Sequence, residues 1–316
     1  MNPTRSVLVT GANGFIGRHV VAALPGCTAA IRTSATNPPS AVRSVRIARI
    51  DASTDWADAL AGIDAVVHLA GLAHRLDGAS GDAEAYEIVN TRGTLRLAEA
   101  AAAAGVRDFV FASSIAVHGT TTDGRAPFRE SDAFRPAGPY GASKAKAEDG
   151  LAALAARSGM AVTVMRPPLV HGRDAPGNLG RLSAALRSGI PLPLASVRNR
   201  RAFLGVANLA DFVSWRLAHD NRGFEAFLLA DDDQPATPEF VTMLGDAMGL
   251  RPRLVPFPQR LLHAGLAAAG RRGMAEGLVA SLEVDTGKSR AAGWRPPLGL
   301  AEGLRAAWRP DQSTLA

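Results

Sequence analysis

Short apolar stretches alternate with helical stretches from Arg5 to about Arg166. The apolar stretches predict six strands: VLVT (7–10), TAAIR (28–32), VRIARI (45–50), AVVHLA (65–70), FVFAS (109–113) and AVTVMR (161–166). Three of the intervening stretches predict helices, over about 14–24, 95–104 and 140–157. Strands that are apolar throughout and separated by helices are typical of a parallel sheet covered on both faces. The pattern therefore predicts an α/β fold with a doubly wound parallel sheet.

The regular alternation of strands and helices ends after Pro167. Segment 167–201 is rich in proline and glycine, and the later elements are mainly helical, with EAFLLAD (225–231) as the last clear strand. We expect a first domain over 1–166, to which a segment near 202–231 returns. A smaller, mainly helical lobe for the substrate is expected over 167–309, and residues 310–316 read as a loose tail.

Composition narrows the class of protein. The chain is 47% apolar and 20% charged, as in globular proteins with a sizeable core. Its net charge of +6 comes from dispersed arginines, and aromatic residues make up 5%, which argues against a nucleic-acid platform. The single cysteine, Cys27, allows no intrachain disulfide. No leader and no bilayer-spanning apolar run is found, so we expect a cytoplasmic protein with no membrane partner. No metal site is expected.

A glycine triplet lies between the first strand and the first helix. In VLVTGANGFIG the glycines are Gly11, Gly14 and Gly17. This position requires a tight turn, close approach of the backbone to a pyrophosphate, and close packing of helix on strand. A glycine triplet after the first strand of a βαβ series predicts a dinucleotide site, so 1–166 is expected to be an NAD(P)-binding domain.

The residues expected at the adenosine end favour NADP(H), with NAD(H) as the alternative. An NAD site usually has an acidic residue at the end of the second strand, where this chain has Arg32. Arg32 can hold a 2′-phosphate, or it can simply point into solvent. Asp51 closes the predicted third strand, where it can accept from the adenine amino group or cap a helix.

A rare tyrosine precedes a rare lysine by four residues in GPYGASKAKAED. Residues i and i+4 share a helix face, so the Lys144 ammonium should favour the Tyr140 phenolate and lower its pKa from about 10. Such a group can take a proton from a sugar hydroxyl or return one to a ketone. In isolation the pair would read as a helical surface pair. However, Ser113 and Ser114 end the preceding buried strand, at the edge where α/β sheets bind ligands.

Together these motifs resemble the extended short-chain dehydrogenase/reductases, the NAD-dependent epimerase/dehydratase family. The resemblance rests on the glycine triplet, HLAG (68–71), Asn90, Ser114 and the Tyr140–Lys144 pair, and it covers nearly the whole chain. It implies a Rossmann-type fold in which Ser114, Tyr140 and Lys144 are catalytic and Lys144 also binds the nicotinamide ribose. His118 stands where the family usually has tyrosine, so a substrate contact there is in doubt.

The resemblance also implies the binding residues. Those expected to bind the cofactor are Gly11, Asn13, Gly14, Phe15, Ile16, Gly17, Arg32, Asp51, Leu69, Ala70, Gly71, Asn90, Lys144 and Pro167. Ser114 is expected to contact the substrate, Asn178 its nucleotide diphosphate, and Arg201 to clamp that diphosphate. The alternative for Arg201 is an ion pair within the lobe. A second clamping arginine is not clearly placed, with Arg271 and Arg272 as candidates out of register.

Two positions exclude some reactions of the family. Sugar 4,6-dehydratases need an acidic pair directly after the catalytic Ser/Thr, and this chain has Ile115 and Ala116 there. A cysteine base is disfavoured because Cys27 lies far back in the cofactor half. Hydride chemistry at C4 remains.

The expected function is therefore action at C4 of a nucleotide sugar. Arg32 favours reduction of a UDP-4-keto-6-deoxy-N-acetylhexosamine in surface-polysaccharide synthesis, and the alternative is a UDP-glucose or UDP-N-acetylglucosamine 4-epimerase. The family's usual state implies a homodimer. Two other classes are weighed: a non-catalytic NADP-sensing or nucleic-acid-binding relative, which can lose the Tyr–Lys pair that this chain retains, and a reductase of flavonoid- or steroid-like ketones, which needs no diphosphate clamp.

Overall fold

A seven-stranded parallel sheet forms the centre of the molecule. The computed structural model describes residues 5–38, 41, 43–73, 81–270 and 272–308 of the 316-residue chain. The strands are β1 (Val7–Thr10), β2 (Thr28–Arg32), β3 (Arg43–Ile47), β4 (Ala65–His68), β5 (Asp108–Ala112), β6 (Ala161–Arg166) and β9 (Phe224–Leu228). Their order is β3-β2-β1-β4-β5-β6-β9, and every neighbouring pair is parallel. The predicted Rossmann-type α/β fold is confirmed.

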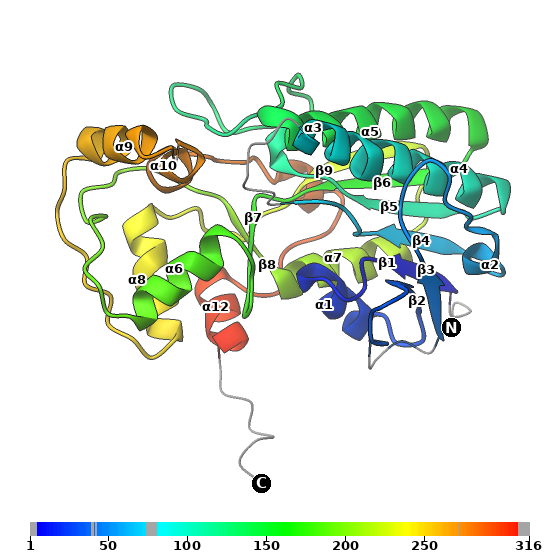
Figure 1. Cartoon of the computed structure of the whole chain (residues 1–316), viewed down its shortest axis with the longest axis horizontal. Coiled ribbons are helices and arrows are strands. Elements are labelled where there is room, and N and C mark those ends of the chain that lie inside the picture. The colour runs from blue at the N-terminus through cyan, green and yellow to red at the C-terminus, as the bar shows by residue number, and fades with distance from the viewer. Residues whose placement is uncertain (1–4, 39–40, 42, 74–80, 271, 309–316) are drawn as a thin grey trace, which may run out of the picture.

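Helices cover both faces of this sheet (Figure 1). On one face lie α1 (Phe15–Ala23) and α7 (Val206–Ala218), which pack against each other. On the other lie α4 (Thr94–Ala103) and α5 (Gly138–Ser158), together with the shorter α2 (Ala57–Leu60), α3 (Gly81–Tyr86) and the π-helical segment η1 (Glu87–Gly93).

The two-sided burial explains why the strands are apolar throughout. Successive side chains of a strand point to opposite faces. Leu8 and Val66 join the core on the α4 and α5 side, whereas Val7, Val9 and Val67 join the core on the α1 and α7 side. Each face therefore needs apolar residues at every second position, and the two requirements together produce a continuous apolar run.

The second half of the chain builds a smaller lobe around a separate core. It contains β7 (Leu169–His171), β8 (Phe203–Gly205), α6 (Asn178–Arg187), α8 (Thr237–Ala247), α9 (Gln259–Ala268), α10 (Arg272–Val279) and α12 (Leu300–Trp308), whereas α11 (Gly287–Ala291) packs beside β9 of the large sheet. Stacked rings of Phe203 and Phe240, 3.8 Å apart, lie in this core. Segment 202–231 contains β8 in this lobe, and then α7 and β9 in the layers of the large sheet. The predicted tail lies outside the described residues.

Side chains occupy the outer edge of β9, which is the last strand of the sheet. Glu130 Oε1 accepts a hydrogen bond of 2.8 Å from the Leu228 amide. Lys288 Nζ donates one of 2.7 Å to the Ala226 carbonyl and lies 4.7 Å from the centre of the Phe227 ring. Two outward backbone groups of the edge strand are thereby satisfied.

None of the helices in the described part of the chain is both long and apolar enough to cross a bilayer.

Candidate active site

The glycine loop between β1 and α1 packs directly on the backbone that follows β4. Gly11 has φ +69°, and a Cβ added to it would lie 2.7 Å from the Ala70 amide nitrogen. A Cβ on Gly17 would overlap the carbonyl oxygen of Gly11. The first turn of α1 carries no acidic residue, so its free N–H groups face no negative charge. This cradle fits the pyrophosphate of a dinucleotide.

Substitution of Gly17 by alanine should therefore disturb both stability and cofactor binding. We expect the free energy of unfolding to fall by about 2 kcal/mol, because the start of α1 must move away from the loop. Affinity for NAD(H) should fall roughly 100-fold, by analogy with misplacement of about 1 Å in a reacting site. Denaturant unfolding and cofactor titration measure the two effects. Gly265→Ala is the matched control, since a Cβ there meets nothing within 4 Å, and equal behaviour of the two variants would contradict the account.

A buried hydrogen-bond chain supports the loop after β4. Thr10 Oγ1 lies 2.6 Å from His68 Nδ1, and His68 Nε2 lies 3.0 Å from Thr94 Oγ1. Burial, with a smaller effect of the Lys144 charge, lowers the pKa of His68 to about 3, so the ring is neutral. The Thr10 hydroxyl also accepts from the Ala70 amide at 3.3 Å. The chain fixes the half-buried Leu69 and Ala70 beside the glycine loop.

Asn90 connects this loop to α5. It is fully buried in η1, its Oδ1 accepts from the Leu72 amide at 2.8 Å, and its Nδ2 donates to the Leu72 carbonyl and to Ser143 Oγ. A Cβ on Gly71 would lie 3.0 Å from Asn90 Oδ1 and 3.3 Å from Lys144 Nζ. The loops after β1 and β4 and the first turns of α5 therefore meet at one edge of the sheet.

Ser114 and Tyr140 face each other at the same edge. Ser114 follows β5, and its hydroxyl accepts from the Ala116 amide at 3.2 Å. Tyr140 lies in the first turn of α5, half-buried, with its ring edge-on to Tyr86 at 5.8 Å. The Ser114 hydroxyl lies near that of Tyr140 and acts to lower the pKa of the tyrosine. An oxygen of a substrate placed here can contact both hydroxyl groups.

Lys144 is held by the end of β5 and not by the tyrosine. Its Nζ donates to the Ala112 carbonyl at 2.8 Å and lies 4.5 Å from the centre of the Phe111 ring. Burial lowers the pKa of Lys144 to about 8, and the Glu148 carboxylate limits this fall.

The lowered tyrosine pKa expected from the Lys144 spacing is wrong for this structure. Burial raises the pKa of Tyr140 above its usual value, and the Ser114 hydroxyl offsets the rise only in part. The i, i+4 spacing puts both residues on one helix face but carries no information on the loss of hydration, which disfavours the phenolate.

The depressed lysine pKa leads to a stability prediction. Because the pKa of Lys144 falls from 10.5 to about 8 on folding, the unfolded chain binds more protons between these values. Stability should therefore rise with pH across this window and be lowest, from this group, below about pH 8. We expect Lys144→Met to raise the free energy of unfolding at pH 7 by about 2 kcal/mol. The difference in stability between the variant and the original protein should become smaller by pH 10.

Denaturant unfolding of the cofactor-free protein at the two pH values tests this expectation. Lys146→Met removes an exposed lysine from the same helix and should change stability little. A Lys144→Met variant that is less stable than the original protein at pH 7 would show that the ammonium contributes more through its contacts than its burial costs.

A buried ion pair lies directly behind the reacting groups. Arg166 donates to Glu148 at 2.6 and 3.0 Å, and Ser113 Oγ donates to the same carboxylate. Arg166 also bonds to the Glu130 carbonyl and, at 3.0 Å, to His118 Nε2. Ser113 is therefore buried and bonded within this network, whereas its neighbour Ser114 faces the site. The sequence did not reveal the Glu148–Arg166 pair, although Glu148 is one turn beyond Lys144.

His118 belongs to that network. It is 2% exposed and stacks on Phe128, with the ring centres 5.5 Å apart. Burial and the Arg166 charge lower its pKa to about 4, so it is neutral at pH 7. His118, which stands where the family usually has tyrosine, therefore packs on Phe128 and bonds to Arg166.

The adenosine-end candidates lie on the β2 and β3 side. Arg32 is the exposed last residue of β2. The predicted third strand was too long: β3 ends at Ile47, and Asp51 follows it in a turn and does not close the strand. Asp51 accepts from the amide and hydroxyl of Ser53 at 2.8 and 2.7 Å and pairs with Arg49. These local bonds direct the chain away from the sheet, and α2 begins later, so Asp51 is not its N-cap.

The other cofactor candidates surround the glycine loop. Asn13 Nδ2 donates to the Thr36 carbonyl at 2.8 Å, which ties the loop to the segment after β2. Phe15 packs on the core of the smaller lobe and Ile16 on the core under α1 and α7. Pro167 is buried, and its carbonyl accepts from the Ile115 amide at 3.0 Å.

The substrate candidates lie around α10. Arg201 is 9% exposed, and its Nη1 donates to the carbonyls of Ala280 at 2.7 Å and Glu276 at 3.3 Å, at the end of α10. Burial lowers its pKa to about 10, so it stays charged at pH 7. Asn178 is the exposed first residue of α6, and a Cβ on Gly277 of α10 would lie 3.6 Å from its Nδ2.

The two candidates for a second clamping arginine lack described side chains. Arg271 lies outside the described residues, and the side chain of Arg272 is not described, although α10 begins there.

Sequence reasoning missed a buried carboxylate that joins the two parts of the molecule. Asp231, just after β9, lies 2.7 Å from His171 Nε2 and accepts from Asn208 Nδ2 at 2.7 Å and from the Gly205 amide at 3.0 Å. It therefore connects β7, β8 and α7. The three consecutive aspartates at 231–233 gave no signal for this role because only the first is buried.

The chain belongs to the NAD dependent epimerase/dehydratase family. The family model matches residues 7–230, which include the glycine loop, Ser114, Tyr140 and Lys144. The protein is accordingly an NAD-dependent enzyme of the epimerase/dehydratase class.

Curated and solved relatives match nearly the whole chain. A UDP-glucose 4-epimerase of Vibrio cholerae is 34% identical over 313 residues, covering 95% of this chain and 94% of its own length. A GDP-6-deoxy-D-mannose reductase of Pseudomonas aeruginosa is 26% identical, with 96% of each chain covered. The solved structure of MoeE5 in complex with UDP-glucose and NAD is 28% identical, with a TM-score of 0.78, and covers 98% of this chain and 100% of its own.

Proposed function

We propose that this enzyme transfers hydride reversibly at C4 of a UDP-linked hexose and acts as a UDP-hexose 4-epimerase. The observation that carries the proposal is the convergence of Ser114, Tyr140 and Lys144 on the edge of the sheet where the glycine loop lies. The Vibrio cholerae relative and the UDP-glucose complex of MoeE5 support UDP-hexose as the substrate class.

Each side chain has a distinct role in this chemistry. The protonated Tyr140 donates its proton to the C4 oxygen when the ketone is reduced, and the resulting phenolate takes the proton of the C4 hydroxyl when the sugar is oxidised. Ser114 donates a hydrogen bond to the same sugar oxygen and orients it. The buried Lys144 ammonium supplies positive charge near the Tyr140 oxygen, which is anionic in the phenolate form. A bound nicotinamide would supply the reversible acceptor for the hydride of C4.

The residues after Ser114 support hydride chemistry alone. Ile115 is buried, and Ala116 uses its carbonyl to accept from the Ala137 amide at 3.2 Å. Neither side chain can move a proton at C5 or C6 of a sugar. We therefore propose no dehydratase activity.

The second candidate is a reductase of a UDP-4-keto-6-deoxy-N-acetylhexosamine. One observation favours it: Arg32 stands exposed at the end of β2, where NAD enzymes usually have an acidic residue. An arginine there suits the 2′-phosphate of NADP(H). A reductase would consume one NADPH for each product and release NADP⁺ after each turnover. Arg201 and Asn178 are proposed to hold the substrate diphosphate in both cases.

A labelled substrate separates the two candidates. With UDP-glucose carrying deuterium at C4 and catalytic NAD, an epimerase produces UDP-galactose that keeps the label at C4. With a UDP-4-keto-6-deoxy sugar, a reductase consumes NADPH in proportion to product and transfers the label from deuterated NADPH. Inversion without added reductant supports the epimerase, and stoichiometric consumption supports the reductase. If neither reaction occurs with any UDP-hexose, the proposal is overturned.

A further inference from the structure

The large apolar side chains that remain exposed lie at one end of the smaller lobe. Among the described residues they are Ile190, Val255, Phe257 and Leu261, with exposed fractions between 39% and 60%. The segment after Ile190 runs beside the segment before Val255: the Leu192 amide donates to the Arg253 carbonyl, and the Val255 amide donates to Leu192. These four side chains thus belong to one region and not to scattered surface positions.

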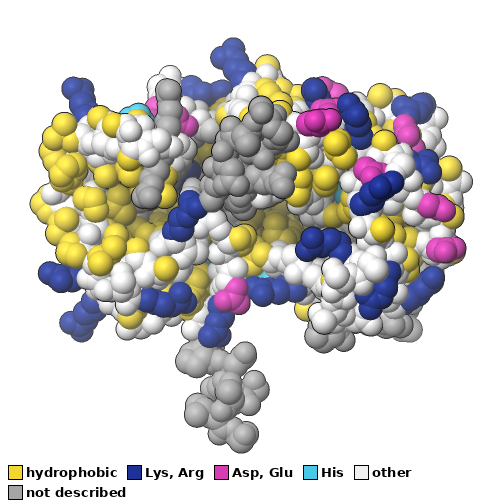
Figure 2. Space-filling view, in the orientation of Figure 1, with side chains coloured by type: hydrophobic (Ala, Val, Ile, Leu, Met, Phe, Trp, Pro, Cys, Tyr) yellow, Lys and Arg dark blue, Asp and Glu magenta, His cyan; other side chains and the backbone are white. Residues whose placement is uncertain are grey.

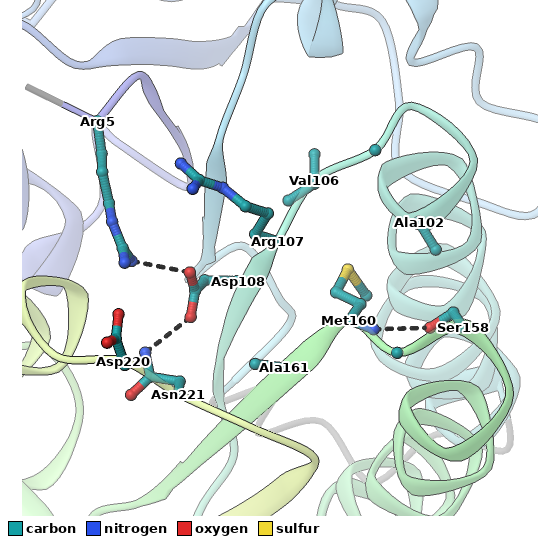
Figure 3. Close-up of a pocket in the computed structure, with 12 residues that line it drawn as sticks. Arg5, Ala102, Val106, Arg107, Asp108, Ser158, Met160, Ala161, Asp220 and Asn221 are labelled. Carbon is teal, nitrogen blue, oxygen red and sulfur yellow. Dashed lines mark hydrogen bonds and ion pairs between the residues drawn. The ribbon is translucent and has the colours of Figure 1, made fainter. Parts of the chain in front are cut away.

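The outward side of α9 continues this apolar surface. Leu261, Ala264, Gly265 and Ala268 are exposed along one stripe of the helix, while Leu262 on the other side packs on the lobe core. No residue of α9 is buried. A surface helix normally presents polar residues to water. Figure 2 shows hydrophobic side chains gathered at the end of the molecule where Figure 1 places α9 and α10.

The stretch of chain that carries this surface holds charges of one sign, although Asp123 and Glu276 line a pocket together with Arg260 on the inner side of α9. From Arg251 to Ala275 the sequence contains five arginines and no acidic residue. Arg251, Arg253 and Arg260 are exposed, and within the described residues none of them pairs with a carboxylate. A second copy of the chain meeting this face symmetrically would bring cation against cation. An anionic partner with an apolar interior satisfies both the charges and the apolar side chains.

We propose that this surface, the α9 face, docks on an anionic bilayer. The α9 face comprises Val255, Phe257 and the outward residues of α9, with the three exposed arginines beside them. A helix with an apolar side and flanking cations lies in the plane of the headgroups, where the apolar groups enter the acyl boundary and the cations meet lipid phosphates. No membrane partner was expected from the sequence, because it has no segment able to span a bilayer and its dispersed arginines read as a solvated surface.

Vesicle co-sedimentation of the full chain tests the proposal. The protein should sediment with phosphatidylglycerol–phosphatidylcholine vesicles but weakly with pure phosphatidylcholine, and salt should weaken the binding. The double variant Phe257→Ser/Leu261→Ser should bind at least about tenfold more weakly, because it removes exposed apolar area that would enter the bilayer.

A matched pair of charge variants separates the face from net charge. Ala264→Asp lies in the α9 face and Ala153→Asp at an exposed position of α5, and both lower the net charge equally. Only Ala264→Asp should weaken vesicle binding by about tenfold or more. Absent binding to anionic vesicles, or equal losses in both variants, would overturn the proposal. A dimer that Phe257→Ser/Leu261→Ser dissociates, as seen by sedimentation velocity, would also overturn it and assign the face to a second copy.

Discussion

Replacement of Tyr140 by phenylalanine should lower kcat roughly a thousandfold. General acid–base catalysis by one positioned side chain contributes about 10²–10⁴ in rate, and Tyr140 is the titratable side chain beside Ser114. The ring is retained, so its edge-on packing against Tyr86 and the fold should remain. Initial rates of C4 inversion, together with cofactor titration, measure the effect.

The matched control is the chain's other tyrosine. Tyr86→Phe removes a hydroxyl from the same ring pair without removing the Ser114 partner, and we expect a loss of less than about tenfold. NAD(H) affinity should be similar in both variants and in the original protein. Comparable losses in the two variants, or full activity of Tyr140→Phe, would remove Tyr140 from the role of acid and base.

Removal of Glu148 should have the largest effect on stability. The Glu148→Ala variant leaves the Arg166 guanidinium buried, with 4% of its side chain exposed, and without its carboxylate partner. Loss of one partner of a buried pair typically costs about 3–5 kcal/mol. We expect denaturant unfolding to show a fall in this range, with reduced activity because Ser113, bonded to Glu148, precedes Ser114.

A double variant tests whether the cost arises from the unpaired charge. Glu148→Leu/Arg166→Met replaces both ions by apolar groups and should be more stable than either single variant. If the double variant is as unstable as the sum of the single variants, packing of these side chains and not their charges accounts for the loss.

The fold could be predicted from the sequence because burial on two faces leaves a continuous pattern. The predicted strands at 7–10, 28–32 and 161–166 match β1, β2 and β6 residue for residue. The third strand was overextended because ARI continues the apolar alternation, and only the local bonds of Asp51 show that the chain has already left the sheet. Local bonds of this kind carry little signal in a hydrophobic pattern.

The site was predicted in part. Spacing and element order correctly brought Ser114 and Tyr140 to one edge and placed Lys144 on the same helix face. Spacing could not give the pKa of Tyr140, because desolvation depends on what covers the ring. The buried supports were also missed, since Glu148 reads as an ordinary helical carboxylate and Asp231 as one of three surface aspartates. Such contacts join residues far apart in the sequence.

The occupied edge of β9 restricts how subunits can associate. A strand from another chain would need the outward amide of Leu228 and the outward carbonyl of Ala226 to extend the ladder, and Glu130 and Lys288 already hold both. A continuous sheet across two subunits is therefore blocked on this side. An assembly that leaves these bonds intact cannot add a strand at β9, so the β9 side of the enzyme can meet another subunit only through helices, loops or side chains.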